Sequence, residues 1–282
     1  MRQRNGERPI EMNRKNGDLA LGRQNKIILY NQVNSLCNKG LSTREISKIT
    51  KIPKSTVWQW VSKKNHPLTN INKPNLQRSP CLSYILGVIY GDGSVGKYKR
   101  HYSIQLAAVN YDFVKEFNKC LTKIMNKKTE YKIQKKIFKN THRLDQDVFR
   151  ASSKIFYTFL RGKDFKDFLN IIKKYPDEFI RGFADSEGSV SSHSHNTNIL
   201  EPCISMANKN KELLEFIKNL LYQYFGIKAH VHQHTYHNSY ISYSLDISNK
   251  DGVYKFYKSI NFTNSDKKKK LAKIIKQMEI KK

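Results

Sequence analysis

Two acidic residues, Asp92 and Glu187, occupy the same place in two similar segments of the chain. Residues 85–95 read ILGVIYGDGSV and residues 180–190 read IRGFADSEGSV, so the acids lie 95 residues apart. Two carboxylates that a fold brings together repel each other, and a hard cation with oxygen ligands, above all Mg²⁺, relieves that repulsion. A phosphodiester held at such a cation can be hydrolysed by an activated water. The two acids therefore predict metal-dependent hydrolysis of a phosphodiester.

Small residues precede each acid at helical spacing. Gly87 and Gly91 lie four apart in the first segment, and Gly182 and Ser186 hold the same places in the second. Residues four apart share one helix face, and small side chains there let two helix backbones approach closely. We therefore expect two helices that pack along these positions. The acids then fall at the helix C-termini, where the helix dipoles add negative potential.

A second acid in the later segment needs a separate interpretation. Asp185 matches Tyr90 of the first segment and lies two residues before Glu187. On a helix that turns 100° per residue, its side chain points about 200° away from that of Glu187. We expect Asp185 to be structural rather than a metal ligand.

The repetition extends beyond the two acidic segments. Residues 103–121 align with residues 203–221, and DVFRASSKIFYTFL and SLDISNKDGVYKFY each read as a strand leading into a helix. Each copy thus predicts the order helix–strand–strand–helix–strand–strand–helix. The sequence predicts an α+β domain with a pseudo-twofold axis over residues 81–282, with repeat 1 at 81–175 and repeat 2 at 176–282.

The paired segments resemble the two signature motifs of the LAGLIDADG homing endonucleases in their single-chain form, and the resemblance covers about residues 82–282. It implies that the two motif helices pack side by side and that two four-stranded sheets form a saddle over DNA. It also implies that Asp92 and Glu187 bind Mg²⁺, with Mn²⁺ as a substitute. The implied activity is a site-specific double-strand break that leaves short 3′ overhangs.

The resemblance also implies supporting catalytic residues. A polar residue after the second strand of each half would lie near the scissile phosphates, and Asn110 and Asn208 match that position, although each is equally interpreted as a helix cap. A basic residue after the last helix of each half would stabilise the charge of the reacting phosphate. Lys174 (or Lys173) and Lys267 (or Lys268) are the candidates, although a lysine run is also typical of a solvated face.

The saddle interpretation assigns DNA contacts to polar side chains of the strands. His230, His232 and His234 alternate along one strand and share a face. Three histidines so placed also suit zinc, but no carboxylate nearby in sequence would orient them, which disfavours that reading. The remaining candidates for base contacts are Lys97, Lys99, Arg100, Tyr102, His193, His195 and Asn196.

The N-terminal region predicts a separate DNA-binding unit. Ser42 and Glu45 form a capping box that opens one short helix, and a turn at Pro53 leads into a second helix. We expect a flexible basic segment at 1–22, a helix-turn-helix domain at 23–64 and a linker at 65–80. A small helical bundle with a solvated basic face is the alternative. The second helix would read bases in the major groove through Lys54, Ser55, Thr56 and Gln59.

The charge balance selects the class of partner. The chain has 52 Lys and Arg against 23 Asp and Glu, a formal net charge of +29. Such an excess favours a polyanion, here double-stranded DNA, with the chain's own intron RNA as a second candidate. No apolar run is long enough for a membrane span and no secretory signal is recognisable. Four scattered cysteines suit a reducing, intracellular compartment, cytoplasmic or organellar.

These observations favour a monomeric endonuclease over two other classes. One alternative is a DNA-binding transcriptional regulator on a catalytically retired nuclease scaffold. The other is an RNA maturase that assists intron splicing. An acid in both motifs favours the nuclease over the regulator, because a retired site does not need two converging carboxylates. The sequence leaves maturase activity open.

Overall fold

The computed structural model describes residues 23–64, 66–67, 73–99, 101–139, 142–194, 200–236 and 240–280. The chain forms two compact units, residues 1–71 and residues 72–282. The predicted flexible segment 1–22 lies outside the described residues. Among the described residues, no helix is both long and apolar enough to cross a bilayer.

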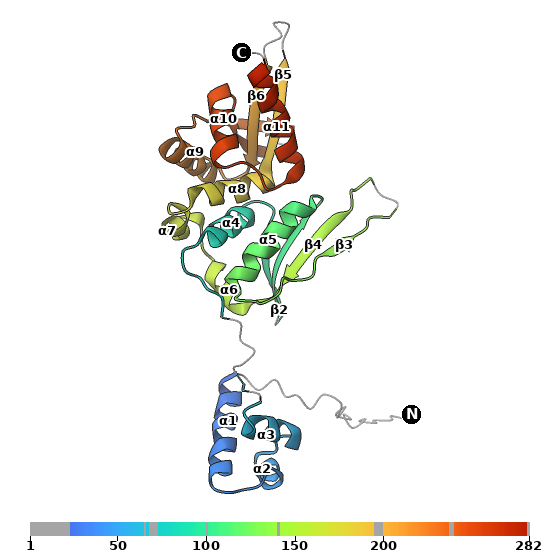
Figure 1. The fold of residues 1–282 in the computed structure, drawn as a ribbon. Coiled ribbons are helices and arrows are strands. Elements are labelled where there is room, and N and C mark those ends of the chain that lie inside the picture. Colours follow the sequence, from blue (N-terminus) through green and yellow to red (C-terminus); the bar gives the residue numbers. More distant parts are fainter. Residues whose placement is uncertain are drawn as a thin grey trace, which may run out of the picture. The chain divides into compact units, whose positions relative to one another are not determined.

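The smaller unit contains three helices around a small apolar core (Figure 1): α1 (Arg23–Asn38), α2 (Thr43–Thr50) and α3 (Lys54–Val61). The predicted capping box opens α2: the Ser42 hydroxyl accepts a hydrogen bond from the Glu45 amide, and the Glu45 carboxylate accepts one from the Ser42 amide at 2.8 Å. The core is apolar and drawn from all three helices and the turn between α2 and α3: Val33, Ile46, Ile52, Val57 and Trp60.

The start of α3 is left in solvent by this packing. Lys51 adopts a left-handed conformation (φ 56°) in the turn, and Pro53 precedes the first residue of α3. Lys54, Ser55 and Gln59 are exposed, and Thr56 is half-buried. The turn therefore presents the four predicted DNA-contacting side chains at or near the surface of the unit.

The larger unit consists of two halves with the predicted order of elements, which confirms the α+β class. The first half contains α4 (Pro80–Ile89), β1 (Ser94–Tyr98), β2 (His101–Ala108), α5 (Tyr111–Ile124), β3 (Gln134–Lys136), β4 (Gln146–Ala151) and α6 (Lys154–Leu160), followed by η1 (Phe165–Phe168) and α7 (Leu169–Ile172). The second half contains α8 (Pro176–Glu187), β5 (Gly188–Ser194), β6 (Leu200–Asn208), α9 (Lys211–Phe225), β7 (His230–Tyr236), β8 (Tyr240–Ile247), α10 (Lys250–Ser259) and α11 (Ser265–Ile280).

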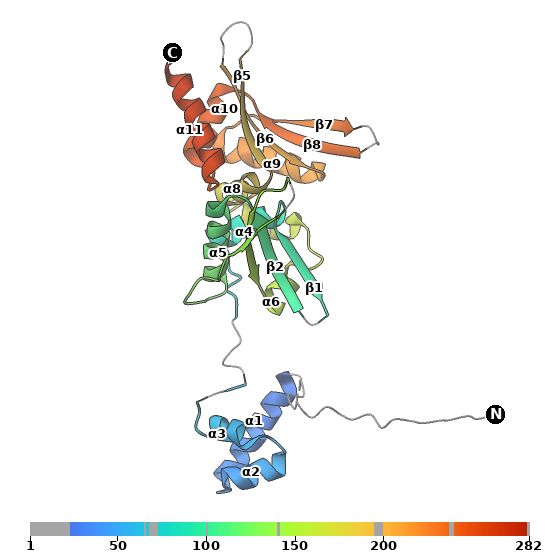
Figure 2. The same cartoon turned by 90° about the vertical axis from the view of Figure 1, so that its right-hand side faces the viewer.

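Each half has one four-stranded antiparallel sheet, with the orders β1-β2-β4-β3 and β5-β6-β8-β7. The identical strand order follows from the duplication. One face of each sheet packs into the core through buried residues such as Leu106, Phe149, Met206 and Leu245. Figure 2 shows the two sheets one beyond the other along the larger unit, with α4 and α8 between them.

The motif helices α4 and α8 pack against each other through their small residues. A Cβ atom at Gly87 would lie 2.1 Å from the Phe179 carbonyl oxygen, and one at Gly182 would lie 2.3 Å from the Tyr84 carbonyl oxygen. Only glycine allows two backbones to meet so closely. The contacts run in the same direction along both helices, so their C-terminal ends lie together.

The segment before α4 belongs to the larger unit, which shortens the predicted linker 65–80. The Asn75 amide donates to the Ile124 carbonyl oxygen at 2.6 Å, and the Asn126 side chain donates to the Lys73 carbonyl oxygen at 3.0 Å. Leu76 packs against the main core. The polar and proline-rich composition of this segment indicated a linker, but these contacts anchor residues 73–79 to the end of α5.

Candidate active site and nucleic-acid surface

The two motif acids lie where the ends of α4 and α8 meet. Asp92 lies in the turn that ends α4, and Glu187 is the last residue of α8. A Cβ atom at Gly91 would lie 2.4 Å from the Ser186 Cβ and 3.2 Å from the Glu187 Cγ. The stem of Glu187 therefore lies against the residue that precedes Asp92. Close helix packing thus brings the acids of the two halves into one site.

The electrostatics of this site are unfavourable for two anions. Burial raises the pKa of Glu187 to about 7, with a further contribution from the charge of Asp92, while Lys267 opposes both effects. Asp92 is open to solvent on one side, yet the surrounding protein removes enough water from its carboxylate to raise its pKa, against the opposing effect of Lys267. No described residue donates a hydrogen bond to either carboxylate. A cation bound at the two carboxylates would relieve this unfavourable electrostatics.

Lys267 lies at the same helix end but is held by the backbone. Its Nζ donates to the carbonyl oxygens of Ala184, Asp185 and Ser186 at 3.1, 2.6 and 3.1 Å. The Ala184 carbonyl also accepts a hydrogen bond from the Gly188 amide, and the ammonium group caps this end of α8. Burial lowers the pKa of Lys267, and the neighbouring carboxylates oppose that shift. Its charge therefore lies beside the acids without an ion pair to either one within the described residues.

Asp185 has the structural role expected for it. Its carboxylate is buried and accepts hydrogen bonds from the Tyr84 hydroxyl at 2.9 Å and from the amides of Thr263 and Asn264 at 2.8 and 2.9 Å. Burial raises its pKa, and these hydrogen bonds oppose the shift. Asp185 thereby ties α8 to α4 and to the loop before α11, which carries Lys267.

The predicted pairing of Asn110 with Asn208 is wrong by two residues. Asn110 caps α5 by accepting from the Phe113 amide at 3.1 Å, and the equivalent cap of α9 is Asn210, which accepts from the Leu213 amide at 3.1 Å. Asn208 is instead the last residue of β6. The cap interpretation therefore describes Asn110 and not Asn208.

Both asparagines nevertheless reach across to the other half. The Asn110 side chain donates to the Ser265 hydroxyl at 3.0 Å and to the Asp266 carboxylate at 2.9 Å, at the start of α11. The Asn208 side chain donates to the Tyr90 carbonyl oxygen at 3.4 Å, in the turn that leads to Asp92. Each asparagine thus supports the segment that carries a candidate catalytic residue of the opposite half.

The predicted place of Lys174 is wrong. Lys174 precedes α8, and its neighbour Tyr175 accepts a hydrogen bond through its carbonyl oxygen from the Ser83 hydroxyl near the start of α4 at 2.7 Å. Glu187 lies at the other end of α8, about 20 Å away at 1.5 Å per residue. The sequence placed Lys174 after the last helix of its half, but η1 and α7 carry the chain back to the N-terminal ends of the motif helices.

Two predicted DNA contacts of the first sheet, Lys97 and Tyr102, lie on the wrong face of the sheet. Lys97 pairs with Tyr102 across β1 and β2, and Tyr102 shares its face of β2 with the buried Ile104. The Tyr102 ring lies 5.1 Å from the Tyr157 ring of α6, so this is the helix-covered side. The prediction took these residues for the open face because they belong to a basic, aromatic stretch. Lys99 lies in the turn between the strands and is exposed.

The open face of the first sheet carries other polar residues. The register places His101, Ser103 and Gln105 of β2 on that face, with Arg150 opposite Gln105 on β4. None of them was predicted. Alternation around the apolar Ile104 and Leu106 was the signal that could have identified them.

The histidines of β7 lie on the open face of the second sheet, as their spacing predicts. His230, His232 and His234 pair with Asp246, Ser244 and Ser242 of β8, whereas Val231 pairs with the buried Leu245. A His234 ring nitrogen lies 2.9 Å from the Ser244 hydroxyl, and His232 lies 3.8 Å from the Asp246 carboxylate. These polar contacts hold the histidines side by side on a surface without helices.

Four other predicted contacts lie where the structure says little or nothing. Arg100, His195 and Asn196 are outside the described residues. The backbone of His193 belongs to β5, opposite Glu201.

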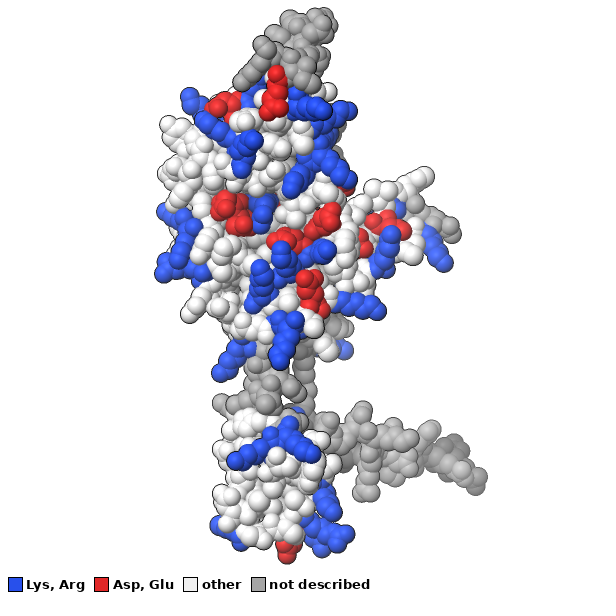
Figure 3. All heavy atoms as spheres, in the orientation of Figure 1, with Lys and Arg blue, Asp and Glu red and all other residues white. Residues whose placement is uncertain are grey.

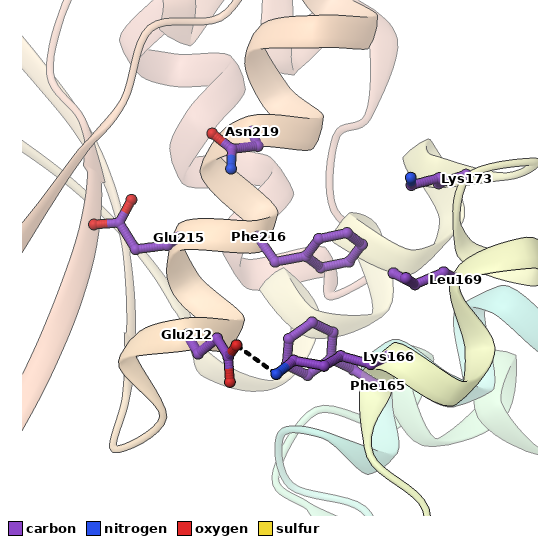
Figure 4. Close-up of a pocket in the computed structure, with 8 residues that line it drawn as sticks. All are labelled: Phe165, Lys166, Leu169, Lys173, Glu212, Glu215, Phe216 and Asn219. Atoms are coloured by element: carbon purple, nitrogen blue, oxygen red, sulfur yellow. Dashed lines mark ion pairs between the residues drawn. The ribbon is translucent and has the colours of Figure 1, made fainter.

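On the face of the larger unit that Figure 3 draws, basic side chains do not gather in one patch. On the face drawn in Figure 3, Lys and Arg are scattered across the larger unit, and acidic side chains lie between them. Figure 4 shows a pocket of about 370 Å³ between η1–α7 and α9, where Lys166 forms a 2.5 Å ion pair with Glu212. The lining comes from both halves, and its two lysines, Lys166 and Lys173, are matched by two carboxylates, Glu212 and Glu215, so the pocket offers no excess of positive charge.

A cation at the acid pair would have two protein ligands. Within the described ranges, no group of three or more His, Cys, Asp or Glu side chains is arranged to hold a metal ion. Mg²⁺ is commonly bound by one or two carboxylates, with waters and substrate phosphates completing its shell. Two carboxylates without hydrogen-bond donors fit that ligand set.

Comparison with known proteins agrees with this architecture. Residues 81–174 match the WhiA LAGLIDADG-like domain, and residues 174–261 match the LAGLIDADG-like domain. An uncharacterized protein of Methanocaldococcus jannaschii, MJ0398, is 31% identical over 276 residues, which cover 91% of this chain and 96% of that protein. The chain belongs to the LAGLIDADG family. A second protein of that organism, MJ0314, is 35% identical over 168 residues, covering 58% of this chain and 62% of that protein.

Solved structures of LAGLIDADG proteins show weaker likenesses. A structure of mesophilic variants of the homing endonuclease I-DmoI has a TM-score of 0.45 and 26% identity, covering 64% of this chain and 88% of that one. I-DmoI in complex with DNA and Mn has a TM-score of 0.45 and 25% identity, covering 64% of this chain and 96% of that one. Full-length DUF199/WhiA from Thermatoga maritima has a TM-score of 0.48 and 18% identity, covering 75% of this chain and 63% of that one.

Proposed function

We propose that this LAGLIDADG protein is a site-specific DNA endonuclease that makes a metal-dependent double-strand break and leaves short 3′ overhangs. The observation that carries the proposal is the pair of carboxylates, Asp92 and Glu187, at the joined ends of α4 and α8. Their pKa values are raised and no described residue donates a hydrogen bond to them. Such a costly arrangement is typical of functional sites.

The chain's own residues have distinct parts in this proposal. Asp92 and Glu187 would hold Mg²⁺, or Mn²⁺ in its place. Lys267, fixed at the end of α8, keeps positive potential beside the phosphate that carries the developing negative charge. Asn208 supports the turn that leads to Asp92, and Asn110 supports the start of α11. When bound, the metal ion supplies Lewis-acid activation of the phosphodiester and of the attacking water.

Recognition of the target is assigned to two surfaces. The open faces of the sheets contact duplex DNA through side chains such as Gln105, Arg150 and His232. The start of α3 reads a flanking sequence through Lys54, Ser55, Thr56 and Gln59, in the manner of a helix-turn-helix recognition helix. Phosphate contacts from the scattered lysines would make binding strongly salt-dependent.

Selection of cleaved sites from a random duplex library in Mg²⁺ tests this proposal. The wild-type protein is compared with Asp92→Asn and Glu187→Gln, which remove one negative charge each and keep the shape of the side chain. We expect a defined set of cleaved sequences from the wild type and none from the variants. Binding of a defined site by all three proteins without cleavage by any of them would reject the enzyme.

The smaller unit supports a second candidate, a DNA-binding transcriptional regulator. Its three helices and the exposed start of α3 suit sequence reading without any chemistry. In that case the acid pair would have no function, and Asp92→Asn would stabilise the larger unit by relieving repulsion without changing DNA binding. The library experiment separates the two candidates because a regulator enriches bound sites and no cleaved ends.

A further inference from the structure

The first half contains a basic pocket that the proposed cleavage reaction does not use. It has a volume of about 620 Å³ and is formed by the segment before α4, the end of α6, η1, α7 and the residue pair that precedes α8. Arg78, Lys163 and Lys174 line it, together with Phe159 and Asn170. The volume lies in the range of ligand sites, and the lining combines cations, an aromatic ring and an amide.

The three cations of this pocket outnumber the one carboxylate in its lining. Within the described residues, Arg78, Lys163 and Lys174 form no ion pair. The one carboxylate of the lining, that of Asp167, accepts a hydrogen bond from the Asp164 amide at 2.7 Å and caps η1. Three cations that converge on one cavity repel each other, and an anionic ligand relieves that repulsion.

An aromatic platform lies beside these charges. The Phe159 ring is half-buried and lies 5.1 Å from the fully packed Phe168 ring, centroid to centroid. The Lys163 ammonium lies over both rings, 4.9 Å from the Phe159 centroid and 5.4 Å from that of Phe168, so a base that stacks on this face of Phe159 would take the place of the ammonium. An aromatic ring held in place next to cations is the arrangement that proteins use to stack a base and bind its phosphate.

The pocket lies away from the acid pair. Arg78 directly precedes the N-cap of α4, and Lys174 lies just before α8, so both are at the N-terminal ends of the motif helices. Asp92 and Glu187 lie at the C-terminal ends, about 20 Å away along α8. In Figure 1, α7 is on the left of the larger unit and the strands β3 and β4 are on the right. A nucleic acid at the acids and one in this pocket would occupy different places.

We propose that this pocket binds a nucleotide of a single-stranded nucleic acid, with its phosphate on Arg78, Lys163 and Lys174 and its base on Phe159. A single strand is favoured over a duplex because only an unstacked base can reach a ring inside a pocket. The Asn170 amide, which can both donate and accept, lies in the same lining to contact the base edge. The site does not depend on DNA cleavage, so either proposal can fail without the other.

Binding of a short labelled strand tests the site. The full-length chain with Asp92→Asn and Glu187→Gln, which prevents degradation of the probe, is titrated with a fluorescent oligouridine of about eight nucleotides, and anisotropy gives the affinity. The pocket variant combines Arg78→Gln, Lys163→Gln and Lys174→Gln. The matched control combines Lys115→Gln, Lys250→Gln and Lys276→Gln, three exposed lysines of α5, α10 and α11 that remove the same charge.

We expect the pocket variant to bind the strand at least about tenfold more weakly than the control at physiological salt, because three phosphate contacts are lost. Phe159→Leu, which leaves the charge unchanged, should weaken binding about fivefold or more through loss of stacking. Thermal melting checks that each variant is folded. Equal losses for the pocket and control variants, with no effect of Phe159→Leu, would show general surface charge only and overturn the proposal.

Two competitors identify the source of the nucleotide. A long duplex should displace the probe less effectively than the unlabelled single strand does. If the pocket variant loses more affinity for duplex than for the single strand, the pocket belongs to the duplex footprint and the proposal is wrong. If uridine monophosphate displaces the probe as effectively as the unlabelled strand does, the ligand is a free nucleotide, and the single-strand assignment is also wrong.

Discussion

The two halves of the larger unit share their order of elements but complete their motif helices differently. At the end of α8, Asp185 binds the loop before α11 and Lys267 caps the final carbonyls. At the end of α4, Tyr90 stands in the place of Asp185, with its ring 6.3 Å from that of Phe179, and the Gly93 amide donates to the Val88 carbonyl oxygen. The C-terminal end of α8 is held by buried polar contacts, and that of α4 by aromatic packing and backbone hydrogen bonds.

This difference shows which features of a duplicated fold must stay paired. The two helices and their acids need each other, because each helix provides half of one interface and, in the proposed site, one ligand. The surroundings of each acid do not need to match, and here they have diverged. The two strands of a bound duplex would therefore meet halves of unequal chemistry, since a lysine caps α8 and no described lysine caps α4.

The largest effect is expected from removing either acid, and it tests whether Asp92 and Glu187 serve one shared site. Asp92→Asn and Glu187→Gln should each lower the rate of double-strand cleavage about a thousandfold, because each removes a charged ligand from one shared site. A duplex labelled on both strands measures the two strands separately. Accumulation of a nicked product by either variant would contradict a shared site, since it would mean that each acid serves one strand.

The next prediction compares Asp185 with Tyr90. Asp185→Ala should lower the free energy of unfolding of the larger unit by about 2–4 kcal/mol, because it leaves one hydroxyl and two amides without their acceptor. Tyr90→Phe should change it by less than about 0.5 kcal/mol, because the Tyr90 hydroxyl has no hydrogen-bond partner among the described residues. Urea denaturation of both variants measures the difference. Similar losses would mean that the equivalent positions have not diverged in role.

The sequence predicted well those features that local pattern and repetition determine. Helical spacing of Gly87 and Gly91 predicted the close helix pair, and Ser42 with Glu45 predicted the start of α2. The two-residue alternation of β7 placed its histidines on one face. In each case the signal lies within a few residues, and the duplication supplied the long-range partner.

Features that depend on register or on the path of a loop were not predicted. A shift of two residues separates Asn208 from the true counterpart of Asn110, because Asn208 is still part of β6, where it pairs with Tyr243 of β8 as Ala108 of β2 pairs with Asp147 of β4. Lys97 and Tyr102 fell on the wrong face because a strand places neighbours on opposite sides. Lys174 is far from the acids because η1 and α7 redirect the chain, which composition does not reveal.

A smaller effect is expected where the two helices touch through side chains. Gly91→Ala would bring a Cβ to 2.4 Å from the Ser186 Cβ, so we expect a loss of about 1–3 kcal/mol in the free energy of unfolding. Ser186→Gly should restore most of this loss in the double variant. At Gly87 the nearest atom is a backbone oxygen, so Ser186→Gly should give no rescue of Gly87→Ala. A double-mutant cycle by denaturation measures both couplings, and rescue at Gly87 would contradict the geometry.

The smallest expected effect concerns the lysine that only one half possesses. Lys267→Met removes the cation that lies beside the acids at the end of α8, while Lys268→Met removes an exposed neighbour and serves as the control. Because the first half has no equivalent among the described residues, the loss should act unequally on the two strands. We expect one strand to be cut about tenfold more slowly relative to the other, which corresponds to about 1.4 kcal/mol of transition-state stabilisation. Single-turnover cleavage of a duplex labelled on both strands measures the ratio, and Asp185→Asn separates loss of the cation from loosening of α8. An equal decrease on both strands would mean that Lys267 acts through the shared metal site rather than through its own half.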